Sequence, residues 1–369
     1  MPGSPDSLGG ITLHGSRILV GTGLLDTGGV SLRAAVGNRR LAIISDDIVA
    51  PLYATRLAAA VGGPAPGLFV VPAGEASKTR MQWARLTDEL LAAGFGRDSA
   101  ILALGGGVVG DLAGFVAATY LRGVPVVQVP TTLLAMIDAS IGGKTGVDTR
   151  AGKNLVGAFH HPALVIVDPD ALHTLPAAHR RNGMAEAIKH GVVASPAEFS
   201  WLVDHAGTIV RDEGADDATI LHLVREHVRL KASIVARDEH ESGLRKVLNF
   251  GHTIGHAIET LSDFRLFHGE CVAIGMMVEA RIAALAGIAD EALAETIALA
   301  LRAAGLPTTP PARMPALEIL AATRTDKKSR RGAVEYALPS ALGVMAGSDR
   351  GHAIAVADDV VVAALEASR

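Results

Sequence analysis

Cysteine is nearly absent from this chain, since Cys271 is the only one among 369 residues. A single thiol cannot form an intrachain disulfide, which fits a reducing compartment. Aromatic residues make up only 4% of the chain and charged residues 20%, while small and branched apolar residues dominate. Such side chains suit helices that pack closely against a sheet. The hydrophobic content of 49% excludes an intrinsically disordered protein.

The chain also lacks a strong charge of either sign. Its formal net charge of -4 gives no reason to expect a nucleic acid or an anionic membrane as partner. No uninterrupted apolar run reaches the length of a transmembrane helix, and the first ten residues lack the basic start and apolar core of a secretion signal. We therefore expect a cytoplasmic protein that binds neither nucleic acid nor membrane, with a disordered tail at residues 1–10.

The first half of the chain alternates between strand-like and helical patterns. Five short, almost wholly apolar runs are typical of strands in a parallel sheet that is covered on both faces. These runs are Leu41–Ser45, Leu68–Val71, Ala100–Leu104, Val126–Val129 and Leu164–Val167. Between the second and third runs, Lys78–Gly94 carries apolar residues at helical spacing. The alternation predicts an α/β domain.

From residue 177 onward the pattern is helical. The expected helices are Ala185–Val193, Ala218–Val235, Thr253–Leu261, Ala273–Ala286 and Glu291–Ala304, with one strand-like segment at Val334–Pro339. The length favours two domains. We predict an α/β, Rossmann-like domain with a parallel-rich sheet at residues 11–176 and an all-α domain at residues 177–369. The cleft between the two is the expected active site.

Three histidines, His252, His256 and His268, lie within 17 residues. The first two are four apart and would share one helix face, and a chain that folds back would bring His268 near them. Imidazole is the commonest metal ligand, and two histidines with a carboxylate form a catalytic zinc arrangement. A histidine satisfied in the core or on the surface is the alternative for His256 and His268, so spacing alone leaves the ligand set open.

A glycine-rich turn, Gly105, Gly106 and Gly107, follows a predicted strand and opens an apolar helix. Glycine lets a backbone approach a pyrophosphate, and a helix N-terminus supplies free amides. The spacing is not G-x-G-x-x-G, so the turn predicts a variant nucleotide site, with a tight turn that merely needs glycine as the alternative. Glu75 follows an earlier strand, where a carboxylate can contact ribose, although Ser77 beside it could simply cap the next helix.

Two lysines, Lys144 and Lys153, lie beside glycines, as in an anion site. The alternative is a pair of solvated loop lysines. Further along, Glu186 lies on an apolar helical stretch with Lys189 three residues later. Such a pair is most often a surface ion pair. If the stretch faces the histidines, however, Glu186 becomes the third metal ligand. The charged run from Asp238 is typical of a solvated face.

Taken together, these segments resemble the 3-dehydroquinate synthase family. The matching strings are GGGVVGDLAGFVAATYLRG, VPTTLLAMIDASIGGKTGVD, GKNLVGAF, GMAEAIKHG, DEHESGLRKVLNFGHTIGHAIE, HGECVAIGM and DKK, in order over roughly residues 40 to 345. The resemblance implies a lyase of the shikimate pathway, which leads to the aromatic amino acids. It would convert 3-deoxy-D-arabino-heptulosonate 7-phosphate into 3-dehydroquinate and phosphate. The implied course is transient oxidation by NAD, β-elimination of phosphate, re-reduction and an intramolecular aldol closure.

The resemblance also implies a role for individual residues. The implied metal ligands, for zinc or cobalt, are Glu186, His252 and His268. The implied catalytic residues are Lys144, Lys189, Lys231, Arg245, Asn249 and His256, the last as a contact to the substrate phosphate. The implied substrate-binding residues are Arg122, Asp138, Asn154 and Lys327, with Lys328 as the other candidate for the last position. The implied NAD-binding residues are Asp46, Glu75, Lys78, Gly105, Gly106, Gly107, Asp111, Thr131, Thr132, Lys144, Lys153 and Thr174.

The family pattern further implies a homodimer in which Arg122 reaches the site of the neighbouring subunit. Amino-dehydroquinate synthases and other sugar phosphate cyclases share the scaffold and are the alternative functions. Arg245, Asn249 and the Asp326–Lys328 string keep the dehydroquinate synthase pattern. A metal-dependent alcohol dehydrogenase would release NADH and need no phosphate clamp, which disfavours it. A non-catalytic nucleotide-binding protein is disfavoured because no implied ligand is missing.

Overall fold

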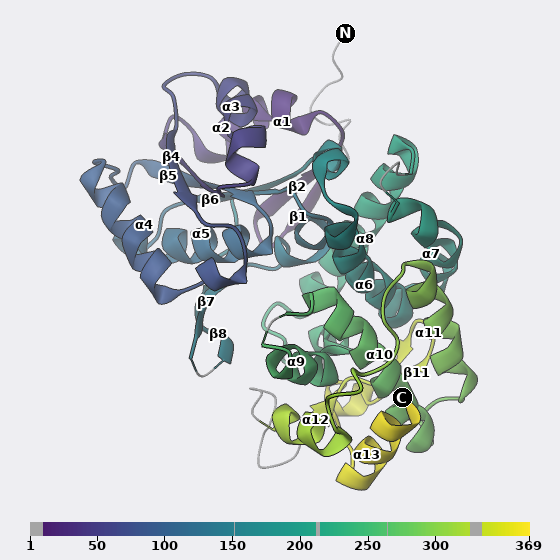
Figure 1. The fold of residues 1–369 in the computed structure, drawn as a ribbon. Helices are drawn as coiled ribbons and strands as arrows, with labels where there is room; N and C mark the ends of the chain where they lie inside the picture. The colour runs from purple at the N-terminus through teal and green to yellow at the C-terminus, as the bar shows by residue number, and fades with distance from the viewer. Residues whose placement is uncertain (1–9, 151, 212–214, 264, 325–333) are drawn as a thin grey trace. The chain divides into compact units, whose positions relative to one another are not determined.

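The computed structural model describes residues 10–150, 152–211, 215–263, 265–324 and 334–369. The chain forms two compact units, and Figure 1 shows the path of the chain through their elements. The first unit contains the chain up to Leu175 and also Asp217–Ala232, and the second contains Pro176–Asp216 and Ser233–Arg369. Helix α8, Asp217–Arg237, therefore gives most of its length to the first unit.

A seven-stranded sheet forms the centre of the first unit, in the order β1-β2-β9-β6-β5-β3-β4. Its strands are β1 Ile11–Leu13, β2 Ser16–Val20, β3 Arg40–Asp46, β4 Gly67–Val71, β5 Ser99–Gly105, β6 Val126–Pro130 and β9 Leu164–Val167. Only β1 and β2 pair antiparallel, and the other neighbours are parallel. The predicted parallel-rich sheet is confirmed, and the five apolar runs correspond to β3, β4, β5, β6 and β9.

Helices cover the sheet of the first unit. They are α1 Leu24–Thr27, α2 Gly29–Val36, α3 Val49–Val61, α4 Arg80–Ala92 and α5 Gly107–Thr119. Figure 1 shows α1, α2 and α3 on one side of the sheet and α4 and α5 on the other. Every residue of β5 and β6 is buried, as expected for strands covered on both faces. On the α4 and α5 side, Leu86 and Leu112 pack with Ile44 in one core cluster.

Two local features of the first unit differ from the sequence-based expectation. The helix after β4 is not capped by Ser77, which lies in the short turn η2, Glu75–Ser77. The cap is Thr79, whose hydroxyl accepts a hydrogen bond from the amide of Gln82 at 3.2 Å. The glycine-flanked lysines do not lie in plain loops either. Their segment forms an antiparallel hairpin of β7, Lys144–Thr149, and β8, Gly152–Phe159.

The second unit is mainly helical. Its helices are α6 Ala177–Ala194, α7 Pro196–Ile209, α9 His252–Leu261, α10 His268–Leu285, α11 Ala292–Ala303, α12 Ala316–Thr323 and α13 Asp358–Ala367. Two small antiparallel pairs modify the expected all-α character: β10 Glu335–Tyr336 with β13 Ile354–Ala355, and β11 Pro339–Ala341 with β12 Val344–Met345. The core includes Ile254 and Ile258 of α9 against Ile274 and Val278 of α10.

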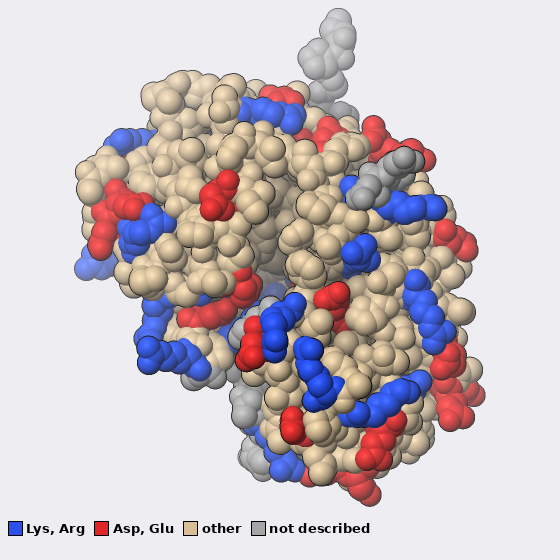
Figure 2. Space-filling view, in the orientation of Figure 1, with Lys and Arg blue, Asp and Glu red and all other residues tan. Residues whose placement is uncertain are grey.

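In the described part of the chain, neither the charges on the face of Figure 2 nor the apolar length of the helices indicates a binding site. On the face displayed in Figure 2, basic and acidic side chains of the described residues are interspersed rather than gathered by sign. None of the helices in the described ranges is both long enough and apolar enough to span a membrane. The chemistry of the described residues therefore lies in local clusters of side chains.

Candidate functional site

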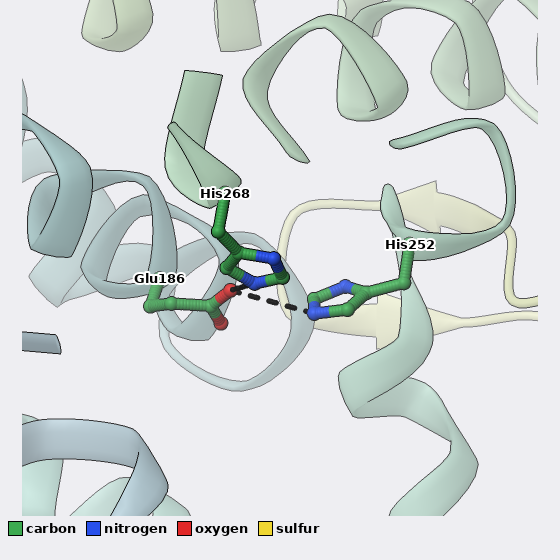
Figure 3. Close-up of side chains that lie close together, drawn as sticks. All are labelled: Glu186, His252 and His268. Atoms are coloured by element: carbon green, nitrogen blue, oxygen red, sulfur yellow. Dashed lines mark hydrogen bonds and ion pairs between the residues drawn. The ribbon is translucent and has the colours of Figure 1, made fainter. Parts of the chain in front are cut away.

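One carboxylate and two histidines converge within the second unit, as Figure 3 shows. Glu186 lies midway along α6, while His252 and His268 are the first residues of α9 and α10. The Nε2 atoms of His252 and His268 lie 3.4 Å and 3.3 Å from the same oxygen, Oε1 of Glu186. One ligand atom from each residue falls within 4.8 Å of the others. The three side chains are close enough to bind one metal ion, and they are the ligand set that the family pattern implies.

The other oxygen of Glu186, Oε2, forms an ion pair with Nζ of Lys189. The Glu186 side chain is 0% exposed and that of Lys189 2%. The expectation that this pair is a surface ion pair is therefore wrong. A buried carboxylate needs a compensating charge, and here Lys189 supplies it from one helical turn away.

His252 is oriented by its own backbone neighbourhood. Its Nδ1 lies 3.2 Å from the carbonyl oxygen of Phe250. If Nδ1 carries the proton and donates it to that carbonyl, Nε2 presents its lone pair toward Glu186. Burial, followed by the charge of Lys189, holds the pKa of His252 well below its usual value. A neutral imidazole is the form that binds a metal ion.

His268 lies between two carboxylates. Its Nε2 faces Glu186, and its Nδ1 lies 3.7 Å from Oε1 of Glu259, which is itself buried. Burial lowers the pKa of His268, but the hydrogen bonds to Glu186 and Glu259 outweigh it and raise the pKa to about 9. The protonated ring thus holds a positive charge where carboxylates meet. A divalent cation would satisfy the same charge requirement.

His256 is part of the same cluster. Its ring centroid lies 5.3 Å from that of His252 and 6.0 Å from that of His268. His256, Glu259 and His268 form a second set of side chains whose ligand atoms fall within 4.8 Å of one another. The arrangement therefore brings together all three histidines that the sequence singled out. The first set has the fully buried carboxylate, Glu186, at its centre.

Asp238 organises the turn that precedes the 3-10 helix η6, Leu244–Asn249, and α9, although its charged run is typical of a solvated face. Its carboxylate accepts hydrogen bonds from the amides of Ser242, Gly243 and Arg245 at 2.9, 2.7 and 2.9 Å, and from the Ser242 hydroxyl at 3.0 Å. Burial raises the pKa of Asp238, but these bonds outweigh it and lower the pKa to about 2. The motif Asp-x-x-x-Ser-Gly, with a short polar side chain ahead of a glycine turn, is the signal that could have identified it.

The two polar residues that follow this turn are held in place. Arg245 is buried, and its Nη1 donates to the carbonyl oxygen of Glu239 at 2.5 Å. Asn249 Nδ2 donates to Oε1 of Glu241, also at 2.5 Å. Both residues lie in the 3-10 helix η6, Leu244–Asn249, directly before α9. A guanidinium presented in this way can bind a carboxylate through two parallel hydrogen bonds.

In the first unit, the glycine turn opens α5 as expected. Gly106 is the N-cap of α5, and glycine has no side chain with which to cap the helix. A Cβ atom at Gly105 would lie 2.7 Å from Cγ2 of Val109, and one at Gly106 3.1 Å from Cγ2 of Thr132. The turn therefore requires small residues, and the first amides of α5 are not covered by a capping side chain of the turn itself. Such a terminus can bind a phosphate.

Charged residues pair along the same unit. Lys78 Nζ lies 2.5 Å from Oδ2 of Asp111, and Lys153 Nζ lies 3.1 Å from Oε1 of Glu75. Lys78 is buried, which lowers its pKa, but Asp111 and then Glu75 outweigh this effect and raise it. Asp46 ends β3, and its Oδ1 accepts hydrogen bonds from the amides of Ile48 and Val49 at the start of α3. Four of the predicted NAD-binding residues thus form two ion pairs.

A further lysine-carboxylate contact involves the π-helical turn η4, Ala135–Ala139. Nζ of Lys231, on α8, lies 2.6 Å from both the carboxylate and the backbone carbonyl of Asp138. Lys144 is exposed on β7, and Asn154 is exposed on the paired strand β8. The backbone of Asn154 is left-handed, with a φ of 53°. The amide of Asn154 donates to Oδ1 of Asp148 at 2.9 Å.

Among the remaining predicted residues, the amide of Thr131 donates to the carbonyl oxygen of Gly105 at 3.0 Å, so that Thr131 and Thr132 lie beside the glycine turn. Thr131 is buried at the end of β6, with Thr132 directly after it, and the exposed Thr174 bonds through its hydroxyl to that of Tyr53 at 2.6 Å. Arg122 is exposed, with a φ of 71°. Lys327 and Lys328 lie outside the described residues.

Comparison with known proteins places this chain in a family. The model of the 3-dehydroquinate synthase N-terminal domain matches residues 68–182, and that of the C-terminal domain matches residues 183–329. The chain belongs to the 3-dehydroquinate synthase family. It is 47% identical over 326 residues to a 3-dehydroquinate synthase of Symbiobacterium thermophilum, a match covering 87% of this chain and 90% of the relative. It is 45% identical over 328 residues to that of Halorhodospira halophila, covering 88% and 90%.

Solved structures of the family's relatives share the fold. A 2-deoxy-scyllo-inosose synthase, in complex with carbaglucose-6-phosphate, NAD⁺ and Co²⁺, has a TM-score of 0.85 at 25% identity, covering 96% of this chain and 97% of that one. The 2-epi-5-epi-valiolone synthase of Streptomyces hygroscopicus subsp. jinggangensis 5008, with NAD⁺ and Zn²⁺ bound, has a TM-score of 0.83 at 32% identity, covering 97% and 96%. A probable glycerol dehydrogenase from Sinorhizobium meliloti 1021 is similar in fold alone, at 18% identity.

Proposed function

We propose that this chain is a 3-dehydroquinate synthase, a lyase that converts 3-deoxy-D-arabino-heptulosonate 7-phosphate into 3-dehydroquinate and phosphate. The observation that carries the proposal is 47% identity to a 3-dehydroquinate synthase over 87% of the chain. The reaction needs a metal site, a nucleotide site and charged contacts to the substrate. The side chains described above offer a candidate for each.

Glu186, His252 and His268 are the proposed ligands of a Zn²⁺ or Co²⁺ ion. Two imidazoles and a carboxylate suit either ion and leave a position for substrate. The fit rests on the 4.8 Å cluster and on the two buried carboxylates, Glu186 and Glu259, between which His268 is held. When bound, the ion acts as a Lewis acid and a template for the substrate's oxygen atoms. The chemistry of the donor set, rather than of any single histidine, supports this assignment.

Lys189 and Lys231 supply positive charge in the proposed reaction. Lys189 pairs with Glu186, and Lys231 with Asp138, so both ammonium groups are held by carboxylates and have restricted rotamers. We propose that they position substrate oxygens and stabilise negative charge that develops on them. Asn249 has the same proposed task as a neutral donor.

Arg245 is the proposed partner of the substrate carboxylate, since a guanidinium matches a carboxylate with two parallel bonds. The contacts of Asp238 and Glu239 fix the backbone and the side chain of Arg245 in advance of binding. His256, Lys144 and Asn154 are the proposed contacts of the phosphate group. Asp138 and one lysine of the Lys327-Lys328 pair, with Lys327 preferred, complete the proposed substrate contacts.

The first unit carries the proposed NAD site. The proposed contacts are Asp46, Glu75, Lys78, Gly105, Gly106, Gly107, Asp111, Thr131, Thr132, Lys144, Lys153 and Thr174. The uncapped first turn of α5 supports a pyrophosphate there, as helix N-termini bind anions. Bound NAD supplies transient oxidation of a substrate alcohol and is restored within each turnover. Because it is restored, one NAD serves many turnovers.

We further propose a cytoplasmic homodimer in which Arg122 contacts the substrate of the neighbouring subunit. The exposed side chain of Arg122 supports that role. The proposed division of labour is an NAD-binding domain at residues 11–176 and a metal- and substrate-binding domain at residues 177–369. Sedimentation equilibrium of the wild type tests the homodimer. Arg122→Ala tests the contact to the neighbouring subunit's substrate, since this variant should remain a dimer in the same measurement and lose activity in an assay of phosphate release.

The substrate assignment is tested by phosphate release from a panel of sugar phosphates. Metal-replete protein with NAD should release phosphate from 3-deoxy-D-arabino-heptulosonate 7-phosphate and form 3-dehydroquinate. Faster release from the amino-substituted substrate, or from glucose 6-phosphate, would assign an amino-dehydroquinate synthase or another cyclase instead.

The ligand assignment is tested by metal content. Because His252 provides a proposed metal bond, His252→Ala should be inactive and metal-poor after purification. His205→Ala is the matched control, since His205 stacks on Trp201 of α7. Full metal occupancy in the His252 variant would refute the assignment.

A further inference from the structure

A buried carboxylate outside the proposed ligand set holds the start of α9. Glu279, on α10, is 0% exposed. Its Oε2 accepts a hydrogen bond from the amide of Gly251 at 2.7 Å, and its Oε1 accepts one from the amide of Ile254 at 3.0 Å. Both amides belong to the first turn of a helix, where backbone N–H groups have no partner within the helix itself. Glu279 therefore caps α9 from another helix.

The sequence of α9 explains why the cap must come from elsewhere. Gly251 is its N-cap, with a left-handed φ of 79°. A Cβ atom at Gly251 would lie 2.6 Å from Cγ of Met276 and 2.8 Å from the carbonyl oxygen of Val272. A serine, threonine or aspartate, the usual capping residues, cannot occupy that position without displacing α10. The close approach of α9 and α10 thus excludes a local cap, and Glu279 replaces it.

The two amides that Glu279 holds flank His252, since Gly251 directly precedes it and Ile254 follows two residues later. His252 also contacts the carbonyl oxygen of Phe250 through Nδ1, on the other side of Gly251. A shift of the Gly251 backbone would therefore move both the ring of His252 and the carbonyl that orients it. A carboxylate at this end of the helix is also favoured by the helix dipole.

We propose that Glu279 is a positioning residue that fixes His252 for metal binding. The inference rests on the proposed metal site, and it adds a residue that does not contact the ion. Outer residues that orient a ligand commonly change metal affinity by about 10- to 100-fold when they are replaced. A residue with a purely structural role would lower stability without such a selective loss.

The other histidine is anchored in a similar way, which supports the reasoning. His268 is the first residue of α10, and the amide of Gly269 donates to Oδ1 of Asn182 at 2.5 Å. Asn182 lies on α6, one turn before Glu186. A Cβ atom at Gly269 would lie 2.1 Å from the carbonyl oxygen of Asn182. Each proposed histidine ligand thus begins a helix whose first turn is held by a side chain from a different helix.

The test compares two substitutions of Glu279 with a matched core variant. Glu279→Leu keeps most of the volume and removes both acceptors, whereas Glu279→Gln keeps one carbonyl oxygen. Ile282→Ala is the control, because Ile282 is 0% exposed on the same helix and belongs to the core cluster in which α10 packs against Ile254 of α9. The affinity for Co²⁺ is measured by competition with a chelator, together with the Co²⁺ absorption spectrum. Hydrogen exchange of the amides of Gly251 and Ile254 is measured without metal.

We expect Glu279→Leu to weaken Co²⁺ binding by about tenfold or more and to alter its spectrum, with Glu279→Gln intermediate. Exchange at the two amides should accelerate in the same order. The Ile282 variant should bind Co²⁺ within about twofold of the wild type although it is less stable. Should Glu279→Leu not fold, the comparison of Glu279→Gln with Ile282→Ala decides in the same way.

Equal Co²⁺ affinity in the Glu279 and Ile282 variants would overturn the positioning role. A failure of the proposed metal site would look different. In that case His252→Ala would also leave Co²⁺ affinity unchanged, although exchange at Gly251 and Ile254 would still respond to Glu279. If His252→Ala weakens binding and Glu279→Leu does not, only the role of Glu279 is wrong.

Discussion

The buried ion pair between Glu186 and Lys189 gives the sharpest prediction about stability. Lys189→Met keeps the length and apolar stem of the side chain but removes the charge. Glu186 would then hold its carboxylate in an environment where it is 0% exposed, without its ammonium partner. Removal of one partner from a buried pair costs about 3–5 kcal/mol, because the remaining charge is uncompensated.

Protonated His268 is a second cation near Glu186, and it should reduce the cost of removing the Lys189 charge. His268 lies 3.3 Å from Oε1 of Glu186, and its raised pKa, about 9, keeps it protonated at neutral pH without metal. This charge partly compensates the carboxylate. We therefore expect a loss of about 3 kcal/mol in the free energy of unfolding of the metal-free protein, at the lower end of the range.

Urea unfolding followed by far-ultraviolet circular dichroism, with a chelator present, measures this loss. The control is the double variant Glu186→Gln, Lys189→Met, which removes both charges. Because no charge is then left unpaired, the double variant should be more stable than Lys189→Met alone. A cost below about 1 kcal/mol for Lys189→Met would show that the pair is not buried as described, since that is the range of exposed pairs. Additive losses in the double variant would refute the coupling.

Four other changes test the proposed phosphate contact, the metal centre, the turn at Asp238 and the packing of α9 on α10. Lys144→Ala should leave the melting temperature unchanged and lower kcat/KM about a hundredfold, as for loss of one oxyanion contact; unchanged kinetics would remove Lys144 from the site. Removal of metal with a chelator should lower the melting temperature and abolish activity, and added Zn²⁺ or Co²⁺ should restore both; activity that survives with no metal detected would contradict the proposed centre. The pKa of Asp238 is about 2 in the folded state against 3.8 ordinarily. Its carboxylate therefore stabilises the folded state above about pH 4, and this stabilisation is lost as the pH falls toward 2. Between about pH 4 and pH 2 the free energy of unfolding should fall by about 1 kcal/mol less in Asp238→Asn than in the wild type, after allowance for solvent screening. Identical pH profiles of the two proteins would exclude a stabilising role of the Asp238 charge. Gly275→Ala should cost about 3 kcal/mol or prevent folding, because its Cβ would lie 1.9 Å from the carbonyl oxygen of Gly251; a normal melting temperature would mean that the helices can separate freely.

The sequence predicts five of the seven strands of the sheet, β3, β4, β5, β6 and β9, from their apolar runs, and it does not predict β1 and β2. Runs such as Ala100–Leu104 and Val126–Val129 are apolar without interruption, and no surface helix produces that pattern. The hairpin of β7 and β8 was not predicted, since its strands carry glycines, lysines and threonines. β8 is largely exposed, so hydrophobic periodicity gives no signal there.

The candidate site could be predicted only in part from spacing. Two of the three proposed ligands, His252 and His268, stood out because histidines cluster in the sequence. Glu186 lies 66 residues before His252 and looks like half of a surface ion pair, so the sequence offers it as a ligand only on the condition that its helix faces the histidines, and the family pattern supports that condition. Burial is a property of the fold, and it is burial that distinguishes Glu186 from an ordinary helix-surface glutamate.

The contacts that organise the site were the hardest to predict. Glu279 acts on amides that lie 25 and 28 residues earlier, and nothing in the local sequence of α10 distinguishes it. Asp238 lies in a charged run, and such runs usually face solvent, although a short carboxylate ahead of a Ser-Gly turn is a recognisable local pattern. Such roles depend on where free backbone amides lie, and the sequence does not give these positions directly.

The proposed use and restoration of NAD within one turnover is tested most directly by a count of turnovers per NAD. Metal-replete protein is mixed with excess 3-deoxy-D-arabino-heptulosonate 7-phosphate and NAD at the concentration of the active sites. Phosphate and 3-dehydroquinate are measured, together with absorbance of NADH. A 3-dehydroquinate synthase should give many equivalents of phosphate and an equal amount of 3-dehydroquinate for each NAD, with no net NADH. Phosphate release that stops after one equivalent while NADH accumulates would contradict this use of NAD.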